Sequence, residues 1–348
     1  MNRILIVLMA LSAAFCSKNP TSDSDTVATA EAVAEKPAYA IVIHGGAGTI
    51  LPENITGEQE AAYREALNAA LTIGEDILKD GGSSRDAVEQ TIIFLENSPL
   101  FNAGKGAVFT SDGHNELDAS MMDGATRNAG AVGGLRHVKN PIQAARAVLE
   151  HSKHVLLTGE GAETFARQQG LDTVPADYFY TDSRWKALER ARAAEASKTG
   201  ALLPVDYKYG TVGCVALDQQ GHITAGTSTG GMTNKRFGRF GDVPVIGAGT
   251  YADDSTCGVS CTGHGEYFIR YAVGHDMTAL MAYKGWSVEE AGQHIIHEKL
   301  KAAGGAGGLI ALDKNGNITM PFNTPGMYRG YARPGERVVG LFGETENR

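Results

Sequence analysis

Two distant segments repeat one pattern of strands and turns, and this repeat restricts the fold more than any other feature. The segments are 211–225 and 308–320, and each places two β-rich runs around a short turn that contains glycine. That pattern is typical of an antiparallel hairpin. The hairpins also end alike, in Thr229-Gly-Gly-Met232 and Thr324-Pro-Gly-Met327. We therefore expect stacked antiparallel sheets.

Segments with apolar residues at helical spacing lie before and between the hairpins. They are 58–78, 84–96, 141–151, 183–198, 266–283 and 288–300, and Ser84 is the expected N-cap of the second. Further strand candidates are 39–44, 107–110 and 117–122, and the polar stretch 170–209 is an expected exposed connector. Strands and helices do not alternate strictly, so the sequence predicts an α+β fold with helices over antiparallel sheets.

The composition excludes several classes of protein. Glycine supplies 44 of the 348 residues without a Gly-X-Y period, which excludes collagen and indicates turns and close backbone approaches. The net charge is −9 and no basic cluster occurs, so the footprint of a nucleic-acid binder is missing. An acidic protein that acts on small molecules is expected. The cysteines at 214, 257 and 261 are expected to be buried without a disulfide.

The N-terminus has the pattern of an export signal. Residues 1–15 join a positive start to an apolar run that is too short to span a membrane. Residues 16–37 form a polar, acidic tether that begins at Cys16, as in bacterial lipoproteins, although Phe15 is larger than the residue that such sites favour. We expect an exported, periplasmic or extracytoplasmic protein, with Cys16 as a candidate lipid anchor and 38–348 as one domain.

Two candidate functions of the glycine-rich loops, phosphate binding and serine-hydrolase catalysis, are excluded by the spacing or the context of the motifs. The loops 44–48 and 228–231 could hold phosphate, but neither the P-loop spacing nor the dinucleotide-binding spacing is present. Residues 226–230 match the Gly-x-Ser-x-Gly motif of serine hydrolases. That motif must lead into a helix, whereas glycines and a proline follow here.

A threonine nucleophile at Thr211 is the third hypothesis. A chain cut between Gly210 and Thr211 would give Thr211 a free α-amino group, which can act as its own base with a pKa near 7.7–8.0. A polar connector meets a buried strand at this point, and glycine allows the strained backbone that an N→O acyl shift needs. The alternative is a threonine that only opens a strand.

Residues downstream of Thr211 favour the catalytic alternative. The hairpin should place Thr229 beside Thr211. Arg239 and Asp242 suit a ligand with a carboxylate and an ammonium group, although a surface ion pair remains the alternative. Thr262 and Gly263 come just before a helix, where a hydroxyl and a backbone N–H can form an oxyanion hole.

Several long motifs in the right order give the chain a family resemblance. They are His44-Gly-Gly-Ala-Gly48, Phe101-Asn-Ala-Gly104, Glu116-Leu-Asp-Ala119, Gly210-Thr-Val-Gly213, Thr227-Ser-Thr-Gly-Gly-Met-Thr-Asn-Lys235, Gly238-Arg-Phe-Gly-Asp242, Cys261-Thr-Gly-His-Gly-Glu266 and Pro321-Phe-Asn-Thr-Pro-Gly-Met327. The chain resembles the plant-type L-asparaginases, or isoaspartyl peptidases, which are N-terminal nucleophile (Ntn) hydrolases.

This resemblance implies a four-layer αββα sandwich that cuts itself into 38–210 and 211–348. It implies an (αβ)₂ assembly, no catalytic cofactor, and hydrolysis of asparagine or β-aspartyl dipeptides through a β-aspartyl ester. The implied roles are Thr211 as nucleophile, Thr229 as the residue that orients it, Thr262 and Gly263 as the oxyanion hole, Arg239 and Asp242 as binders of the substrate carboxylate and ammonium, and Gly265 as lining of the substrate site.

The resemblance also implies a structural sodium ion held mostly by backbone carbonyls. The matching loop includes Leu95, Glu96, Ser98 and Phe101, and Lys105 departs from an apolar position in relatives. Two alternatives stay open for the function. One is a glycosylasparaginase, which shares the nucleophile and fold but lacks the Gly-Gly-Met-Thr-Asn-Lys stretch, and the other is a periplasmic amino-acid-binding protein.

Overall fold

The computed structural model describes residues 36–197 and 210–343, all of which belong to one compact unit that begins at Lys36. The expected export signal 1–15, Cys16 and nearly all of the tether lie outside the described residues. No described helix is both long enough and apolar enough to cross a membrane. Cys214, Cys257 and Cys261 are buried and free, as their apolar surroundings predict.

The larger sheet has eight strands in the order β12-β11-β1-β5-β6-β2-β3-β4. All neighbouring strands are antiparallel except β3 and β4, which are parallel. The strands are β1 (Ala40–Gly48), β2 (Leu117–Asp123), β3 (Ala129–Leu135), β4 (Leu156–Thr158), β5 (Val212–Leu217), β6 (Ile223–Thr229), β11 (Gly326–Arg333) and β12 (Glu336–Phe342).

The smaller sheet has four antiparallel strands in the order β10-β9-β8-β7. They are β7 (Thr250–Ala252), β8 (Cys257–Gly263), β9 (Gly307–Asp313) and β10 (Ile318–Thr319). The two repeated hairpins are therefore β5–β6 in one sheet and β9–β10 in the other. An apolar layer with Val42, Val215 and Ile310 joins the facing surfaces of the sheets.

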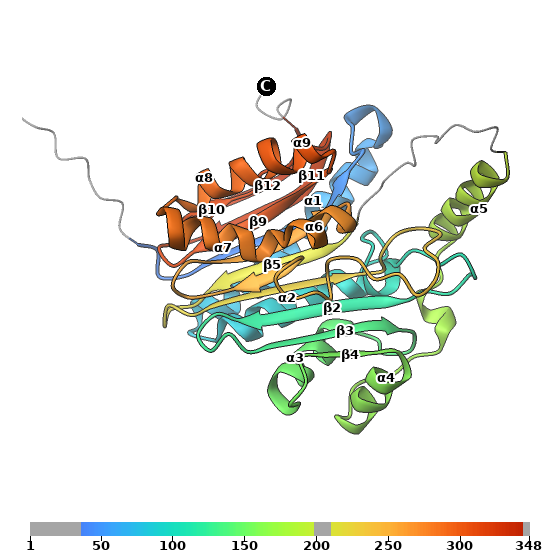
Figure 1. Ribbon diagram of the computed structural model, residues 1–348, viewed down its shortest axis with the longest axis horizontal. Helices are drawn as coiled ribbons and strands as arrows, with labels where there is room; N and C mark the ends of the chain where they lie inside the picture. Colours follow the sequence, from blue (N-terminus) through green and yellow to red (C-terminus); the bar gives the residue numbers. More distant parts are fainter. Residues whose placement is uncertain (1–35, 198–209, 344–348) are drawn as a thin grey trace, which may run out of the picture. The chain divides into compact units, whose positions relative to one another are not determined.

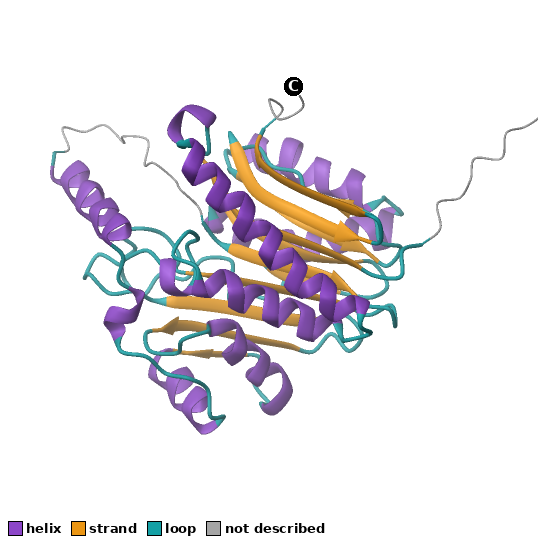
Figure 2. Ribbon diagram, turned by 180° about the vertical axis from the view of Figure 1, so that it is seen from behind, coloured by secondary structure: helices purple, strands orange, loops and turns teal. Residues whose placement is uncertain are grey.

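Helices cover both outer faces, which confirms the αββα sandwich (Figure 1). The larger sheet carries α1 (Gly57–Lys79), α2 (Ser84–Asn97), α3 (Pro141–His151) and α4 (Gly159–Gln168), and α1 and α2 run across it in Figure 2. The smaller sheet carries α6 (Gly265–Tyr271), α7 (Val273–Lys284), α8 (Val288–Gln293), the π-helix His294–Leu300 and α9 (Lys301–Ala303). The connector contributes α5 (Asp182–Ala196), and short 3₁₀ turns lie at Pro52–Asn54, Gly104–Gly106 and Ala176–Phe179.

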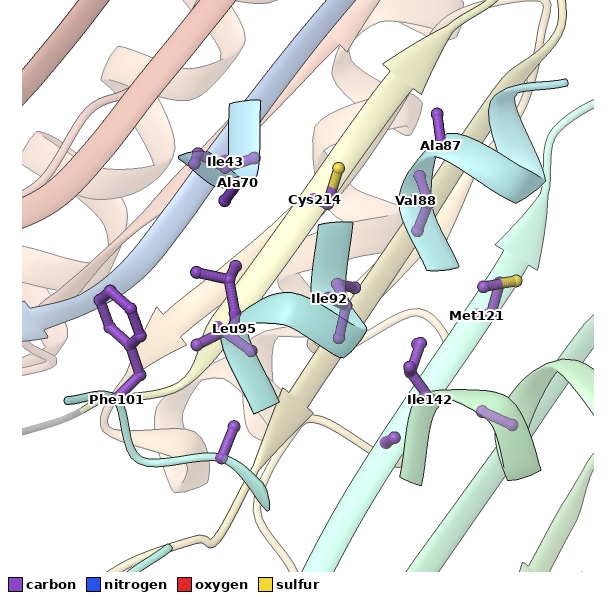
Figure 3. Close-up of a cluster of buried hydrophobic side chains, with 14 of the residues drawn as sticks. Ile43, Ala70, Ala87, Val88, Ile92, Leu95, Phe101, Met121, Ile142 and Cys214 are labelled. Carbon is purple, nitrogen blue, oxygen red and sulfur yellow. The ribbon is translucent and has the colours of Figure 1, made fainter. Parts of the chain in front are cut away.

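Alternation along β5 decides which way its first residues face. Val212 and Cys214 belong to the core beneath the helices, where Cys214 lies beside Ile43 and Ile92 in Figure 3. Val215 and Leu217 belong to the layer between the sheets. Thr211 has the parity of Val215, so its side chain faces the layer between the sheets.

The structure corrects several local predictions. The helix expected over 266–283 is divided by Ala272, which has φ of 48°, and the one expected over 288–300 ends as a π-helix. Residues 107–110 form only an isolated bridge between Phe109 and Asn115. Ser83 rather than Ser84 caps α2, because the Ser83 side chain accepts the Asp86 N–H while Ser84 contacts Thr224.

Gly74 tests how tightly α1 packs on the sheet. Helix propensity alone favours alanine there by about 0.5–1 kcal/mol. A Cβ at Gly74 would collide with the side chains of Ile41 and Thr91, so we expect Gly74→Ala to destabilise the protein by about 1–3 kcal/mol. Gly161→Ala in α4 is the matched control, since its Cβ would meet nothing. Urea unfolding measures both, and equal stabilities would contradict the expectation.

Candidate active site

Thr211 and Thr229 meet at the end of the β5–β6 hairpin. Val212 pairs with Ser228 in this register, so the residues one step outward, Thr211 and Thr229, come opposite each other. Their Oγ1 atoms lie 3.0 Å apart, and both residues are buried. The Gly231 N–H also donates to Thr229 Oγ1 at 3.0 Å. The hairpin argument from the sequence is confirmed in this respect, because the two hydroxyls are in hydrogen-bond contact.

The smaller sheet presents Thr262 to the same layer. Cys257, Val259 and Cys261 of β8 face the helices α6–α8, so the intervening Ser260 and Thr262 face the larger sheet. The Ala47 N–H of β1 donates to Thr262 Oγ1 at 3.3 Å. Because Thr262 accepts in this bond, its hydroxyl hydrogen stays available for an anionic oxygen. Gly263 follows at φ 147°, with Ala306 O only 2.5 Å from where a Cβ would lie.

His44 fixes the backbone of Thr211. Its Nδ1 lies 3.0 Å from Thr211 O, and its Nε2 lies 2.9 Å from Ser260 Oγ. A carbonyl oxygen only accepts, so Nδ1 must carry the hydrogen and Nε2 must accept the Ser260 hydroxyl. Burial lowers the pKa of His44 to about 3, so the ring is neutral. His44 is therefore a positioning group that holds Thr211 without bringing charge.

Asn102 joins the predicted cleavage point to the loop after β6. Its N–H donates to Gly210 O at 2.9 Å, and its carbonyl accepts the Gly230 N–H at 3.0 Å. Its side-chain amide donates to Gly231 O at 2.7 Å and accepts the Val108 N–H at 2.9 Å. A cut before Thr211 would break the bond between the Gly210 carbonyl carbon and the Thr211 nitrogen. The Gly210 carbonyl is thus already polarised by a backbone donor.

Arg239 and Asp242 come together with Gly265. A Cβ on Gly265 would lie 2.8 Å from Asp242 Oδ1 and 2.9 Å from an Arg239 terminal nitrogen, so glycine is needed for this approach. Asp242 Oδ2 is buried without a hydrogen-bond partner, and burial raises the pKa of Asp242 to about 7. A cationic group of a ligand could supply the partner that this buried carboxylate oxygen lacks. This arrangement is not the surface ion pair that was the alternative.

Arg239 already holds a carboxylate. Its Nε and one terminal nitrogen donate to the two oxygens of Glu266 at 2.9 and 3.0 Å. This bidentate geometry matches any carboxylate, including that of a ligand. Glu266 is partly exposed, with 44% of its side-chain surface accessible, so it can turn towards solvent when a ligand carboxylate takes its place.

A buried ionic cluster lies beside Thr229. Asp118 of β2 is directly opposite Thr229 in the β2–β6 register and is fully buried. The Lys235 ammonium, on a side chain only 1% exposed, lies 3.9 Å from Asp118 Oδ2 and 3.8 Å from Glu116 Oε2. It also donates to Glu116 O at 3.3 Å. Arg136 also donates to Glu116 Oε1 at 2.6 Å, so Lys235 is the cation that compensates the buried Asp118 next to the paired threonines.

The acidic side chain of the loop expected to bind sodium is engaged elsewhere. The Glu96 carboxylate turns into the core, where it accepts from Ile142 N, Ser228 Oγ and Asn140 Nδ2. Burial raises the pKa of Glu96 to about 8. The described residues contain no group of three or more His, Cys, Asp or Glu side chains that could hold a metal. Lys105 lies over the Tyr178 ring at 5.2 Å. A sodium ion here would fit carbonyl oxygens only.

Comparison with known proteins identifies the family of the chain. The family model described as asparaginase matches residues 37–339. The chain belongs to the asparaginase family. It is 49% identical to the isoaspartyl peptidase of Salmonella typhimurium, with 87% of this chain and 98% of that protein covered. It is 49% identical to the isoaspartyl peptidase of Escherichia coli, covering 87% and 96%, and 40% identical to the isoaspartyl peptidase/L-asparaginase of Mus musculus, covering 86% and 90%.

Sequence reasoning missed the supporting residues of this asparaginase-family site. His44, Asn102, Lys235 and Glu266 all lie inside the motifs that carry the family resemblance. Several of their partners lie far away in the sequence, for example 27 positions for Arg239 and Glu266 and 216 for His44 and Ser260. The motifs indicate the segments in which these residues lie, but only the folded structure shows which residues they contact.

Lys235 provides a test of the ionic cluster. We expect Lys235→Met to lower the free energy of unfolding by about 3–5 kcal/mol, because Asp118 would keep a buried charge without a partner. Adding Asp118→Asn should restore much of that loss. Lys301→Met removes an exposed lysine as the control. Denaturant unfolding measures these three variants, the Asp118→Asn single variant and the wild type, and additive effects in the double variant would contradict the pairing of Lys235 with Asp118.

Proposed function

We propose that this protein cuts itself between Gly210 and Thr211 and then hydrolyses the side-chain amide of asparagine and the isopeptide bond of β-aspartyl peptides. The observation that carries the proposal is the contact between the Thr211 and Thr229 hydroxyls, directly after Gly210 and at the start of a central strand. The names of the relatives, isoaspartyl peptidase and isoaspartyl peptidase/L-asparaginase, support the same two substrates.

Self-cleavage would begin with attack of Thr211 Oγ1 on the Gly210 carbonyl carbon. The Asn102 N–H would stabilise the negative charge that develops on Gly210 O, because it already donates to that atom. The bond between the Gly210 carbonyl carbon and the Thr211 nitrogen breaks as that nitrogen takes the proton given up by the Thr211 hydroxyl. Gly210 is then esterified to Thr211 Oγ1. Water then hydrolyses the ester to a Gly210 carboxylate and a free Thr211 α-amino group.

Substrate hydrolysis would use that amino group as the base. It accepts the Thr211 hydroxyl proton while Oγ1 attacks the β-carbonyl of the substrate, and Thr229 orients Oγ1. Thr262 and the Gly263 N–H stabilise the oxyanion. The proton passes to the leaving nitrogen, the C–N bond breaks, and a β-aspartyl ester remains on Thr211. Water attacks this ester and releases aspartate.

Substrate recognition would rest on two opposite charges. The substrate α-carboxylate displaces Glu266 from Arg239, and the α-ammonium meets the unpartnered oxygen of Asp242. Gly265 leaves room for the ligand between these two side chains. Both asparagine and β-aspartyl peptides present this same aspartyl end.

Three further properties are part of the proposal. The sequence of residues 1–16 supports export to the periplasm with a candidate lipid anchor at Cys16. The resemblance to plant-type asparaginases supports an (αβ)₂ assembly. It also supports a structural sodium ion, which the carbonyls of Leu95, Glu96, Ser98 and Phe101 would hold and which takes no part in the reaction.

Thr211→Ala tests the nucleophile. We expect a chain that stays whole in denaturing electrophoresis and hydrolyses no substrate, because it lacks the attacking oxygen. Thr211→Ser keeps a hydroxyl and should still cut. The wild type should give two fragments, one with Thr211 at its N-terminus. Normal cleavage of Thr211→Ala would refute the assignment, and an uncut wild type that binds aspartate without hydrolysing amides would favour an amino-acid-binding protein.

Asp242 gives the site a pH-dependent stability. Its pKa is about 7 in the folded protein against a usual 3.8, mainly because of burial. The wild type therefore loses stability as the pH rises from about 4 to about 7. Asp242→Asn should raise the melting temperature above pH 7 and lose this advantage towards pH 4. L-Aspartate should stabilise the wild type more than the variant. Exposed Asp172→Asn is the control, and a pH-independent difference for Asp242→Asn would contradict this account.

A further inference from the structure

Four buried hydroxyl side chains lie next to the paired threonines, in the layer between the sheets. Thr227 comes two residues before Thr229 in β6, so both side chains face this layer. Ser120 of β2 is opposite Thr227 in the register of the larger sheet, and Thr250 is opposite Ser260 in the smaller sheet. All four residues are fully buried. We call Ser120, Thr227, Thr250 and Ser260 the hydroxyl chain.

The hydroxyl chain is continuous from its first member to its last. Ser260 Oγ lies 2.7 Å from Thr227 Oγ1, which lies 2.5 Å from Thr250 Oγ1. Thr250 Oγ1 lies 2.8 Å from Ser120 Oγ. Each hydroxyl is therefore within hydrogen-bond distance of the next. The members come alternately from the smaller and the larger sheet, so the chain ties the two sheets together.

The two ends of the hydroxyl chain reach the two halves of the proposed site. Ser260 Oγ lies 2.9 Å from His44 Nε2, and the same ring holds Thr211 O through Nδ1. At the other end, Ser120 Oγ lies 2.6 Å from Val243 O. Val243 directly follows the aspartate that the proposed function assigns to the substrate ammonium. The chain thus connects the backbone of the nucleophile with the backbone of the substrate-binding loop.

Gly213 leaves the space in which the chain reaches the histidine. It lies between His44 and Thr227 in the larger sheet and is opposite both of them. A Cβ at Gly213 would collide with Ser260 Oγ and with His44 Nε2. The absence of a side chain at this position therefore permits the contact on which one end of the hydroxyl chain depends.

Hydrogen counting gives the hydroxyl chain a direction. His44 Nδ1 donates to a carbonyl, so Nε2 must accept the Ser260 hydrogen. Each further hydroxyl then donates towards His44, and Ser120 donates to Thr250. Ser120 has only one hydrogen for two acceptors, Thr250 Oγ1 and Val243 O. The ring of His44 and the loop at Val243 therefore draw on one ordered set of hydrogens.

Packing alone does not account for the hydroxyl chain. The next residues inward along these strands are apolar, among them Val42, Val215 and Ala225. Replacing both partners of a buried hydrogen bond by apolar groups of the same shape can leave stability nearly unchanged. Apolar residues could therefore fill this row as they fill the next one. The polar row points to a function in the site that it borders.

We propose that the hydroxyl chain is a positioning network, which holds Thr211 at a fixed separation from the aspartyl clamp formed by Arg239 and Asp242. This inference rests on the proposed function and adds four positioning residues to it. The attacking oxygen must meet the substrate carbonyl while the clamp holds the other end of the same small molecule. A fixed separation between nucleophile and clamp keeps the reacting atoms in the geometry for attack.

The two ends of the hydroxyl chain act on different steps. Ser260 holds the ring that fixes the Thr211 carbonyl, so its loss weakens the attack by the Thr211 hydroxyl and lowers kcat. Ser120 holds Val243 and with it the neighbouring Asp242, so its loss loosens the clamp and raises KM. A purely structural role would not separate the two parameters in this way.

Thr227 tests the middle of the chain. Thr227→Val removes only the hydroxyl, and we expect kcat/KM for asparagine to fall about tenfold or more in fully cleaved protein, because nucleophile and clamp are no longer tied together. Thr227→Ser keeps the hydroxyl and should stay within about threefold of the wild type. Thr224→Val is the matched control. Thr224 is a fully buried residue of the same strand whose hydroxyl contacts Ser84 at 3.0 Å on the helix side, and its loss should leave kcat/KM unchanged.

Self-cleavage gives a second measurement on the same variants. It uses the same Thr211 oxygen, so Thr227→Val should also cut itself more slowly than Thr224→Val. Electrophoresis follows the cutting, and the melting temperature shows that both variants are folded. A folded Thr227→Val chain that stays uncut supports the inference equally.

The end variants test the separation of the two steps. Ser260→Ala should lower kcat about tenfold and change KM less than about twofold. Ser120→Ala should raise KM about three- to tenfold and change kcat less than about twofold. Asparagine and β-aspartyl-leucine are both used as substrates. These two variants decide the matter if Thr227→Val does not fold.

Other results overturn the inference. If Thr227→Val cuts itself and hydrolyses substrate like Thr224→Val, the hydroxyl chain only stabilises the fold. If Ser260→Ala and Ser120→Ala change the same kinetic parameter, the chain does not serve two halves of the site. A wild type that hydrolyses neither substrate refutes the proposed function itself, whereas an active wild type with unaffected variants refutes only the role of the hydroxyl chain.

Discussion

The pairing of β5 with strands on both of its sides is the constraint on which the site depends. β1 and β6 flank β5, and their ladders hold every residue from Val212 to Leu217. Thr211 is the residue just before this ladder, so it can become a chain end without leaving its place. The same register brings Thr229 to 3.0 Å from it. A nucleophile that must first be freed from its own chain needs such a fixed strand behind it.

The polar groups around Thr211 reduce the stability of the layer that they occupy. Asp242 and Asp118 are buried carboxylates, and burial raises the pKa of each. Neither Asp118 Oδ2 nor Asp242 Oδ2 accepts a hydrogen bond within the described residues, but the Lys235 ammonium lies 3.9 Å from Asp118 Oδ2. A site that binds a cation must leave its carboxylate short of partners until the ligand arrives. The nearby ammonium therefore distinguishes Asp118 from Asp242, and the proposed function assigns the cation at Asp242 to the ligand.

Local sequence patterns predicted the layers well because they depend on short-range periodicity. The hairpins and the contact of Thr211 with Thr229 follow from strand alternation and tight turns, whereas the four-layer αββα order was implied by the family resemblance. Predictions of smaller features were wrong where tertiary packing determines the local conformation. Ala272 divides an expected helix, and Ser83 caps α2 in place of Ser84. The supporting contacts of His44, Asn102 and Glu266 could not be predicted, because each joins segments that are separated in the sequence and meet only in the folded protein.

Glu266 explains how the clamp can select a ligand with two opposite charges. A ligand carboxylate gains little when it replaces Glu266 on Arg239, since one bidentate ion pair is exchanged for another. An ammonium group at Asp242 gains more, because it supplies the partner that the buried Oδ2 lacks. A ligand with both groups exchanges one ion pair and adds a second, whereas a simple carboxylate only exchanges. In the proposed function, discrimination would thus rest on Asp242, and Arg239 with Glu266 would set the orientation.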